Sequence, residues 1–281
     1  MSRPELTGHA AQFYNATEAA KYDTNSRMVA IQRQITLRAM ELLCLDSSKP
    51  QFILDVGCGS GMSGRVLEES GHYWAGLDVS RDMLTVSAER DDSTKGDLVH
   101  HDMGTGLPFR QATFDGCVSI SALQWLCYSN KSSQVPKRRL VRFFSALYGV
   151  LKRGARAVLQ FYPETAEQAV LISECASKVG FAGGVVVDYP NSTKAKKHYL
   201  VLSFDRGYSA PKGLTDPNAP SQGVRADSLG GKDRSKRAVK KKKAGVKSKE
   251  WIERKKEVQR RKGADVRRDT KFTGRKRKDK F

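Results

Sequence analysis

The segment 52–61, FILDVGCGSG, constrains the fold more than any other stretch of this chain. A short apolar run that ends at an acid and is followed at once by glycines predicts a buried parallel strand and a tight turn. Gly57, Gly59 and Gly61 allow positive φ angles and let the backbone approach a ligand closely. Residues 62–70 then have an apolar helical face. A unit of strand, glycine loop and helix is typical of nucleotide-like ligand sites at the carboxyl end of a parallel sheet.

Two ligand classes fit this loop. Gly59, Gly61 and Gly64 match the dinucleotide fingerprint G-x-G-x-x-G, but that match begins two residues after the strand has ended. The spacing from Asp55 to Gly61, acid-x-G-x-G-x-G, is instead typical of the loop that binds S-adenosylmethionine (SAM) in methyltransferases. An NAD-linked oxidoreductase stays an alternative, which requires a hydride-transfer partner and nicotinamide binding. A glycine turn that binds no ligand is the third interpretation.

Charge divides the chain into a near-neutral part and a basic part. Residues 206–281 contain 27 of the 50 Lys and Arg residues and 9 of the 30 Asp and Glu residues, so they carry +18 of the net charge of +20. We predict a globular domain over residues 1–204, a linker rich in Gly, Pro and Ser over 205–235, and a basic tail over 236–281. The tail indicates a polyanionic partner.

The globular part alternates between strand and helix patterns. Two last strands, at 183–187 and 199–204, have only a basic loop over 194–197 between them, which predicts an antiparallel hairpin at the sheet edge. We therefore expect an α/β fold with a seven-stranded, mostly parallel, Rossmann-like sheet. The other expected strands are 52–56, 73–78, 96–103, 114–122 and 157–162, and the expected helices begin near Met28, Met62, Ser80, Val135 and Glu164.

Polar and sulfur-bearing side chains mark the ends of the second and third strands. Asp78 ends the second strand, where a carboxylate accepts hydrogen bonds from both ribose hydroxyls of NAD or SAM. Ser80 then caps the helix that carries Met83. Asp102 and Met103 end the third strand, where an acid accepts from an adenine amino group and a thioether packs on the ring.

Three further positions are candidates for the substrate side of the site. Ser119 and Ser121 are polar in an otherwise apolar strand end, which predicts that they lie where a sulfonium group and the incoming substrate meet. Trp125 either stacks on a base or packs in the core. Tyr22 and Arg27 stand at the start of a long helix and either close over the glycine loop or belong to the ordinary surface.

The remaining composition narrows the class of protein. The five cysteines form no C-x-x-C pair, so we expect reduced thiols and no metal site. The N-terminus lacks the pattern of a secretory signal, and no apolar run is long enough to span a bilayer. We therefore expect a soluble intracellular protein without a membrane partner.

The basic tail has features of an RNA-binding segment. Residues 248–262, SKEWIERKKEVQRRK, have a thin apolar stripe of Trp251, Ile252 and Val258, which predicts a helix that forms on a partner. Residues 271–281, KFTGRKRKDKF, are basic with aromatic residues. Basic residues interleaved with aromatic ones favour RNA over a membrane, because phosphates accept the charge and bases can stack. A nuclear import signal is compatible with this interpretation.

Nine short motifs, spread over nearly the whole chain, are shared with one family. They are residues 13–14 (FY), 26–28 (SRM), 54–61 (LDVGCGSG), 76–80 (GLDVS), 96–98 (GDL), 119–122 (SISA), 124–127 (QWLC), 187–190 (VDYP) and 272–277 (FTGRKR). On these motifs the chain resembles the eukaryotic 18S rRNA (guanine-N7)-methyltransferases of small-subunit ribosome biogenesis, which are class I SAM-dependent enzymes. The resemblance is weakest over 205–235.

This resemblance implies an activity and a set of site residues. The activity is SAM-dependent methylation of one guanine of 18S rRNA at N7. Guanine N7 has a free in-plane lone pair, so we expect positioning of the base and no acid–base pair. The implied cofactor residues are Arg27, Asp55, Gly57, Cys58, Gly59 and Gly61 for the amino acid part, Asp78 and Met83 near the ribose, and Asp102 and Met103 for adenine; Ser119, Gln124 and Trp125 would face the base.

The resemblance also implies partners and a location. It implies the pre-40S particle, and a small zinc-binding activator subunit along the sheet edge. We expect the third strand, from Leu98 to His101, to be that edge, since unpaired strand edges need a cover. It further implies a nuclear and nucleolar protein with some in the cytoplasm, and an added role in pre-rRNA processing and subunit export. A non-enzymatic assembly factor whose SAM site is secondary stays the alternative.

Overall fold

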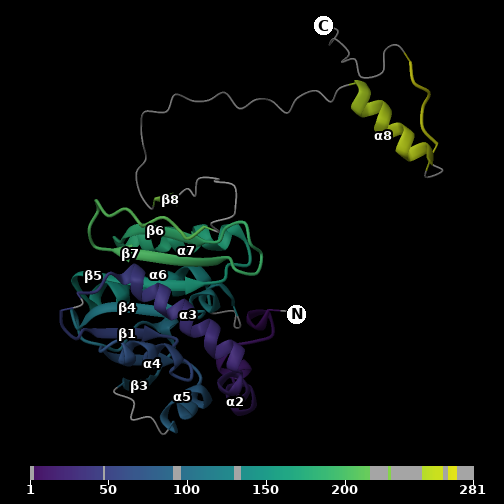
Figure 1. Cartoon of the computed structure of the whole chain (residues 1–281). Helices are drawn as coiled ribbons and strands as arrows, with labels where there is room; N and C mark the ends of the chain where they lie inside the picture. The colour runs from purple at the N-terminus through teal and green to yellow at the C-terminus, as the bar shows by residue number, and fades with distance from the viewer. Residues whose placement is uncertain are drawn as a thin grey trace. The chain divides into compact units, whose positions relative to one another are not determined.

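The computed structural model describes residues 3–46, 48–90, 96–129, 134–215, 227–228, 249–261 and 265–270. The chain forms two compact units, Met1–Gly231 and Lys232–Phe281. Figure 1 shows the sheet with its helices in the first unit and one helix in the second. No helix of the described residues is long and apolar enough to cross a membrane.

A mixed sheet forms the centre of the first unit. Its described strands are β1 (Phe52–Val56), β2 (Tyr73–Asp78), β3 (Gly96–His100), β4 (Phe114–Ile120), β5 (Leu151–Phe161), β6 (Ala182–Asp188), β7 (Lys197–Ser203) and β8 (Asp227–Ser228). Their order is β3-β2-β1-β4-β5-β7-β6-β8. Strands β1 to β5 pair in parallel, and β7 is antiparallel to both β5 and β6. The predicted mostly parallel sheet and its terminal hairpin are confirmed, and the short β8 adds an eighth strand within the predicted linker.

Helices cover both faces of this sheet. The described helices are α1 (Ala10–Phe13), α2 (Ala16–Thr24), α3 (Ser26–Leu43), α4 (Met62–Glu69), α5 (Arg81–Ala88), α6 (Pro136–Val150), α7 (Ala166–Val179) and α8 (Lys249–Arg261), with 3-10 turns η1 (Pro4–Leu6), η2 (Met103–Thr105) and η3 (Leu123–Cys127). Helices α3, α4 and α5 share one buried apolar cluster with the sheet, and α6 and α7 share the other. The sheet is therefore buried on both sides.

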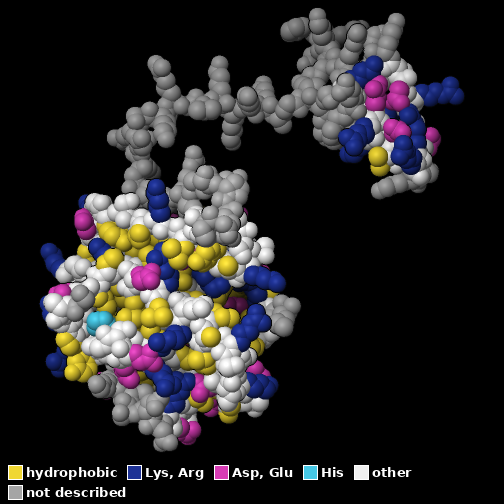
Figure 2. Space-filling model, viewed as in Figure 1, with side chains coloured by type: hydrophobic (Ala, Val, Ile, Leu, Met, Phe, Trp, Pro, Cys, Tyr) yellow, Lys and Arg dark blue, Asp and Glu magenta, His cyan; other side chains and the backbone are white. Residues whose placement is uncertain are grey.

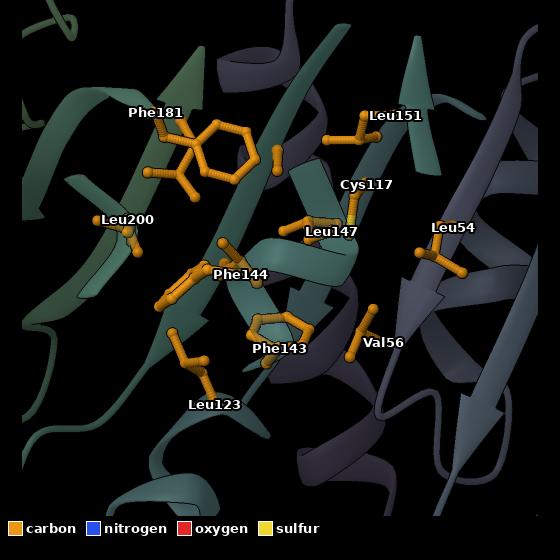
Figure 3. Close-up of a cluster of buried hydrophobic side chains, with 14 of the residues drawn as sticks. Leu54, Val56, Cys117, Leu123, Phe143, Phe144, Leu147, Leu151, Phe181 and Leu200 are labelled. Atoms are coloured by element: carbon orange, nitrogen blue, oxygen red, sulfur yellow. The ribbon is translucent and has the colours of Figure 1, made fainter. Parts of the chain in front are cut away.

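The larger cluster joins α6 to the middle of the sheet (Figure 3). Phe143, Phe144 and Leu147 lie on one helical face, as the spacing of apolar residues predicts, and all three are fully buried. They pack toward Leu54 of β1 and Leu200 of β7. Each side chain of this size contributes roughly 1.5–3 kcal/mol when it is buried. This packing fixes β1 and β4, whose carboxyl ends carry the site described below.

The N-terminal segment contains helices that the sequence pattern did not predict. These helices are α1 and α2. Asn15 caps α2 by accepting from the backbone N–H groups of Thr17 and Glu18. Asn25 caps the predicted helix α3, which follows, by accepting from the Met28 N–H. Helix α1 has four residues and α2 has nine, and most of their side chains are polar or small. Such short segments have little hydrophobic periodicity, so their capping residues are the main sequence signal that they form helices.

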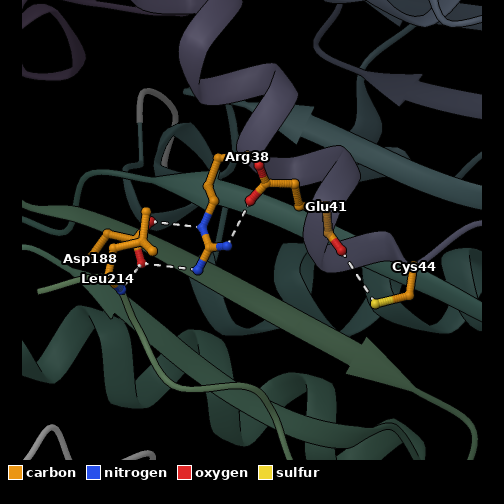
Figure 4. A network of polar contacts seen from close by, with 5 residues as sticks. All are labelled: Arg38, Glu41, Cys44, Asp188 and Leu214. Carbon is orange, nitrogen blue, oxygen red and sulfur yellow. Dashed lines mark hydrogen bonds and ion pairs between the residues drawn. The ribbon is translucent and has the colours of Figure 1, made fainter.

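An ion pair between distant segments extends the first unit beyond residue 204 (Figure 4). Arg38 Nε of α3 donates to Asp188 Oδ2 at the end of β6 at 3.0 Å, and Arg38 Nη1 donates to Glu41 at 2.8 Å. The backbone N–H of Leu214 donates to Asp188 Oδ1 at 2.8 Å. Tyr208 packs under the Arg156 guanidinium at 4.7 Å. These contacts join residues up to Leu214, within the predicted linker, to the first unit.

Charge is mixed on the first unit and concentrated in the second. On the face that Figure 2 shows, basic, acidic and hydrophobic side chains of the first unit alternate. In the second unit α8 lies within the predicted helix over 248–262, and Lys256 and Arg260 both pair with Asp269, at 2.9 and 2.8 Å. The predicted basic segment over 271–281, and residues 236–248 of the predicted tail, lie outside the described residues.

Candidate active site

A cavity that is partly open to solvent lies at the carboxyl ends of β1, β2 and β4. Its walls come from the glycine loop after β1, the ends of β2 and β4, the turn after β3, and the N-terminal helices. The strand order reverses between β1 and β4, and such reversals form the crevice in which ligands of open α/β sheets bind. The cavity therefore lies where the sequence predicted the site.

The glycine loop needs glycine for its conformation. Gly57, Gly59 and Gly61 have φ angles of +74°, +55° and +79°. A Cβ on Gly57 would lie 2.3 Å from the Ala122 side chain. Gly57, Cys58 and Gly59 line the cavity, as predicted. Gly61 does not line the cavity. It is the N-terminal cap of α4, and a Cβ on it would lie 2.4 Å from Ser87 Oγ.

Asp78 is held at the cavity wall with both oxygens oriented. Its Oδ2 accepts from the Gly59 N–H at 3.0 Å and its Oδ1 accepts from the Ser80 N–H at 2.7 Å. Burial raises the pKa of Asp78, and these backbone hydrogen bonds oppose that rise. Each carboxylate oxygen has a second lone pair, so Asp78 can still accept from a vicinal diol.

Asp55 supports the loop from below and does not line the cavity. It is fully buried, and Ser63 Oγ donates to its Oδ2. Its Oδ1 has no hydrogen-bond partner among the described residues. Burial raises the pKa of Asp55 to about 7, and the nearby Asp78 charge adds to the rise. The predicted direct contact with a cofactor is thus corrected to a supporting position under the loop.

Asp102 and Met103 line the cavity as predicted, but Asp102 has a partner that the sequence did not reveal. Arg139 of α6 donates through Nη2 to both Asp102 oxygens, at 2.8 and 2.9 Å, and also lines the cavity. The Gly104 N–H donates to Asp102 Oδ1 at 2.8 Å. A Cβ on Gly104 would lie 2.4 Å from Arg139 Nε, so the arginine packs directly over this turn.

The structure corrects two of the three residues predicted to face the base. Ser119 is fully buried, and its Oγ donates to the Val56 carbonyl at 2.7 Å between β1 and β4. Gln124 is 3 % exposed; its Nε2 donates to the Ser121 carbonyl at 2.8 Å and its Oε1 accepts from the Tyr162 N–H at 3.4 Å. Neither lines the cavity, because backbone groups hold both side chains. Ser121, with φ of +59°, lines it instead.

Trp125 lines the cavity within an aromatic wall. Its ring centroid lies 6.2 Å from Phe13 and 6.0 Å from Tyr14, and Tyr14 lies 6.0 Å from Tyr22. Burial raises the pKa of Tyr14 to about 12, so its hydroxyl stays protonated near neutral pH. Ser80 Oγ donates to the Tyr14 carbonyl at 2.6 Å and so ties this wall to the end of β2. Stacking of Trp125 on a base stays a prediction.

The two remaining predicted cofactor residues differ in position. Met83 of α5 lines the cavity, and its Cε would lie 3.0 Å from a Cβ on Gly59. Arg27 is exposed in the first turn of α3 and is not among the residues that line the cavity, so its pairing with a cofactor carboxylate stays a prediction. Gln32, further along α3, lines the cavity instead.

The arrangement fits SAM and belongs to a known class of fold. The glycine cradle admits no Cβ, and Asp78 presents oriented acceptors at the end of β2. A family model described as "Methyltransferase domain" matches residues 54–159, and one described as "Methyltransferase involved in Williams-Beuren syndrome" matches residues 207–279. Fold and site together define a class I SAM-dependent methyltransferase.

Solved structures agree with this fold. The SAM complex of Haemonchus contortus phosphoethanolamine N-methyltransferase 2 has a TM-score of 0.52 over 72 % of this chain and 60 % of that chain, with 17 % identity. The Synechocystis magnesium protoporphyrin IX methyltransferase, solved with bound SAM, also has a TM-score of 0.52, over 72 % and 97 %, with 14 % identity.

Curated relatives identify the family within this class. The mouse 18S rRNA (guanine-N(7))-methyltransferase is 53 % identical over 99 % of this chain and 98 % of its own length. The Schizosaccharomyces pombe 18S rRNA (guanine-N(7))-methyltransferase bud23 is 46 % identical, and the Saccharomyces cerevisiae 18S rRNA (guanine(1575)-N(7))-methyltransferase is 45 % identical, each over 100 % of both chains. The chain belongs to the 18S rRNA (guanine-N7)-methyltransferase family, which excludes the oxidoreductase alternative.

Proposed function

We propose that this chain transfers the methyl group of SAM to N7 of one guanine in 18S rRNA. The observation that carries the proposal is a sequence identity of 45–53 % over 98–100 % of the length of relatives that bear this name. The cavity supports it, since the glycine loop, Asp78 and the pair Asp102–Met103 surround one volume.

The geometry supports catalysis by positioning. When bound, SAM supplies an electrophilic methyl group, and guanine N7 attacks it with a lone pair that needs no general base. The loop from Gly57 to Ser60 would hold the amino acid part, Asp78 the ribose, and Asp102 with Met103 the adenine. Trp125 and Tyr22 would confine the base in line with the methyl–sulfur bond. Alignment of this kind is worth roughly 7–11 kcal/mol at best.

An in vitro assay tests the target atom. The full chain, with its activator subunit if it requires one, is incubated with labelled SAM and 18S rRNA, and the product is reduced with borohydride and cleaved with aniline. Cleavage at one guanine supports N7 transfer. Label incorporation without cleavage contradicts it and indicates N1 or an exocyclic amine as the target.

The free edge at β3 supports an activator subunit that adds a strand. Among the described strands β3 pairs only with β2, and Leu98 and Val99 are partly buried against the two apolar clusters. An edge with apolar neighbours needs a cover, and a partner strand from Leu98 to His101 would supply it. Expression alone should give little soluble protein and co-expression with the activator should restore it; a well-behaved monomer from expression alone contradicts this partner.

The basic tail supports an added role in pre-40S assembly and a nuclear and nucleolar location with some protein in the cytoplasm. Residues 206–281 carry +18, and this charge suits rRNA. A variant without methyl transfer that still supports subunit maturation would establish a separate assembly role. A variant without the tail that keeps its location would contradict the targeting role.

A further inference from the structure

We propose that the loop between β6 and β7 binds the phosphate backbone of the RNA next to the methylated base. The loop comprises residues 189–196, and Lys197 begins β7 directly after it. Its basic side chains are Lys194, Lys196 and Lys197. The inference rests on the proposed function, because it concerns how an RNA substrate reaches the cavity.

Strand direction places this loop at the same edge of the sheet as the cavity. Strand β7 is antiparallel to β5 and to β6, so β6 runs in the same direction as β5 and the other parallel strands. The carboxyl end of β6 therefore lies at the same edge of the sheet as the carboxyl ends of β1, β2 and β4, with β5 and β7 between β4 and β6. A substrate that enters the cavity from this edge lies beside the β6–β7 loop.

A chain of contacts joins the loop to the cavity wall. Lys197 Nζ lies 5.5 Å from the centre of the Tyr162 ring, a cation–π distance. The Tyr162 N–H donates to Gln124 Oε1, and Gln124 Nε2 donates to the carbonyl of Ser121, which lines the cavity. Trp125, the next residue after Gln124, lines the cavity too. Lys197 is therefore linked through Tyr162 and Gln124 to the aromatic wall that would hold the base, and Lys194 and Lys196 precede it in the same loop.

The positive charge of the loop is not cancelled within the described residues. None of the three lysines forms an ion pair there. Lys197 Nζ instead lies 3.4–3.5 Å from the carbonyls of residues 194–196. Asp188, which ends β6, is already bound by Arg38.

The same rim holds another cation. Arg3 donates to the carbonyls of Tyr162 and Pro163 at 3.0 and 2.9 Å, which fixes its guanidinium beside Tyr162. Arg3 therefore contacts the backbone of the residue whose ring contacts Lys197, and cations close to an aromatic residue are typical of sites that bind single-stranded RNA.

Hydrogen bonds within the loop also hold its backbone. The Ser192 N–H donates to the Tyr189 carbonyl at 3.0 Å, and the Lys196 N–H donates to the Ser192 carbonyl at 3.0 Å. The Ala195 N–H donates to Ser192 Oγ at 3.0 Å. These bonds fix the backbone that carries the lysines, so less conformational entropy is lost when a phosphate binds.

A charge-reversal pair with a matched control tests the proposal. The test variant is Lys194→Glu/Lys196→Glu, which leaves Lys197 and its contact with Tyr162 intact. The control is Arg110→Glu/Arg153→Glu, two exposed arginines near the amino ends of β4 and β5, at the opposite edge of the sheet. Both variants change the net charge equally, so they differ only in the edge that they alter.

Each full-length variant is assayed for KM toward 18S rRNA at several salt concentrations, for affinity toward S-adenosylhomocysteine, and for melting temperature. We expect the lysine variant to raise the KM for RNA about tenfold or more, and to reduce the slope of log affinity against log salt by about 1.4, for two phosphate contacts with single-stranded RNA. Its affinity for S-adenosylhomocysteine and its kcat at saturating RNA should match the wild type.

Three outcomes would overturn the inference. An equal rise of KM in both variants would show a general charge effect. A loss of cofactor affinity with the lysine variant alone would show a structural role for the loop. An unchanged KM with loss of incorporation into pre-40S particles would identify a protein partner. A wild-type protein that does not methylate 18S rRNA contradicts the proposed function itself, which separates the two failures.

Discussion

Replacing Arg139 with Met tests whether Asp102 recognises the adenine of the cofactor. Arg139 bonds both oxygens of Asp102, and the side chains are 11 % and 25 % exposed, so the pair is mostly shielded from water. Methionine keeps roughly the aliphatic part of the side chain and removes the guanidinium. Asp102 then keeps only the Gly104 N–H to orient it and can rotate away from the cavity.

The size of the effect follows from these contacts. A hydrogen bond to a charged group contributes about 1.5–3 kcal/mol, and exposure of the pair reduces this. We expect a loss of about 1.5–2.5 kcal/mol in cofactor binding, which corresponds to roughly 10- to 70-fold weaker affinity. Arg139→Met should also lower the melting temperature of the protein, because the lost hydrogen bonds to Asp102 contribute to the stability of the fold.

Calorimetric titration with two ligands separates recognition from general damage. S-adenosylhomocysteine presents an amino group to Asp102, and S-inosylhomocysteine presents a carbonyl at the same position. Arg139→Met should reduce the preference for the first ligand, and Arg142→Met, an exposed position on the same helix, should preserve it. An equal loss of affinity for both ligands, or none, would refute adenine recognition by Asp102.

Two further predictions concern stability. Asp55 has a folded pKa of about 7, above its ordinary value near 4, so the folded state holds a proton that the unfolded chain releases. Its contribution to stability is complete below about pH 4 and is lost as the pH rises from 4 to 7. Melting temperatures of the apoprotein and of Asp55→Asn should therefore separate in favour of the variant over this range and keep that difference above pH 7; curves that stay parallel from pH 4 to pH 7 would contradict this. Arg38→Met leaves Asp188, whose side chain is 3 % exposed, without its cation. The free energy of unfolding, measured by urea denaturation, should therefore fall by about 3 kcal/mol. A fall of less than about 1 kcal/mol would contradict the energetic role of this ion pair.

Local patterns in the sequence were sufficient for much of the fold and for one side of the site. Gly57, Cys58, Gly59, Asp78, Met83 and the pair Asp102–Met103 line one cavity, because the ends of parallel strands lie at one edge of the sheet; their contacts with SAM stay predictions. The sequence also identified the hairpin of β6 and β7 from two apolar runs without a helix between them.

The errors come from side-chain direction and from contacts between distant segments. Ser119 and Ser121 are two residues apart, and only a positive φ at Ser121 turns its side chain toward the cavity while Ser119 bonds to β1. Arg139 and Asp102 are 37 residues apart, and Arg38 and Asp188 are 150 apart. No local pattern predicts such pairs, which form because helices α3 and α6 pack across the sheet.

The most direct test of the central claim uses 18S rRNA from cells in which Asp78→Ala replaces the wild-type chain. The rRNA is reduced with borohydride and cleaved with aniline, with Asp82→Ala, on the neighbouring helix, as the matched control. We expect cleavage at one guanine to disappear with Asp78→Ala and to persist with Asp82→Ala. Cleavage that persists in cells whose Asp78→Ala protein no longer binds SAM would contradict the assignment of this chain as the methyltransferase of that guanine.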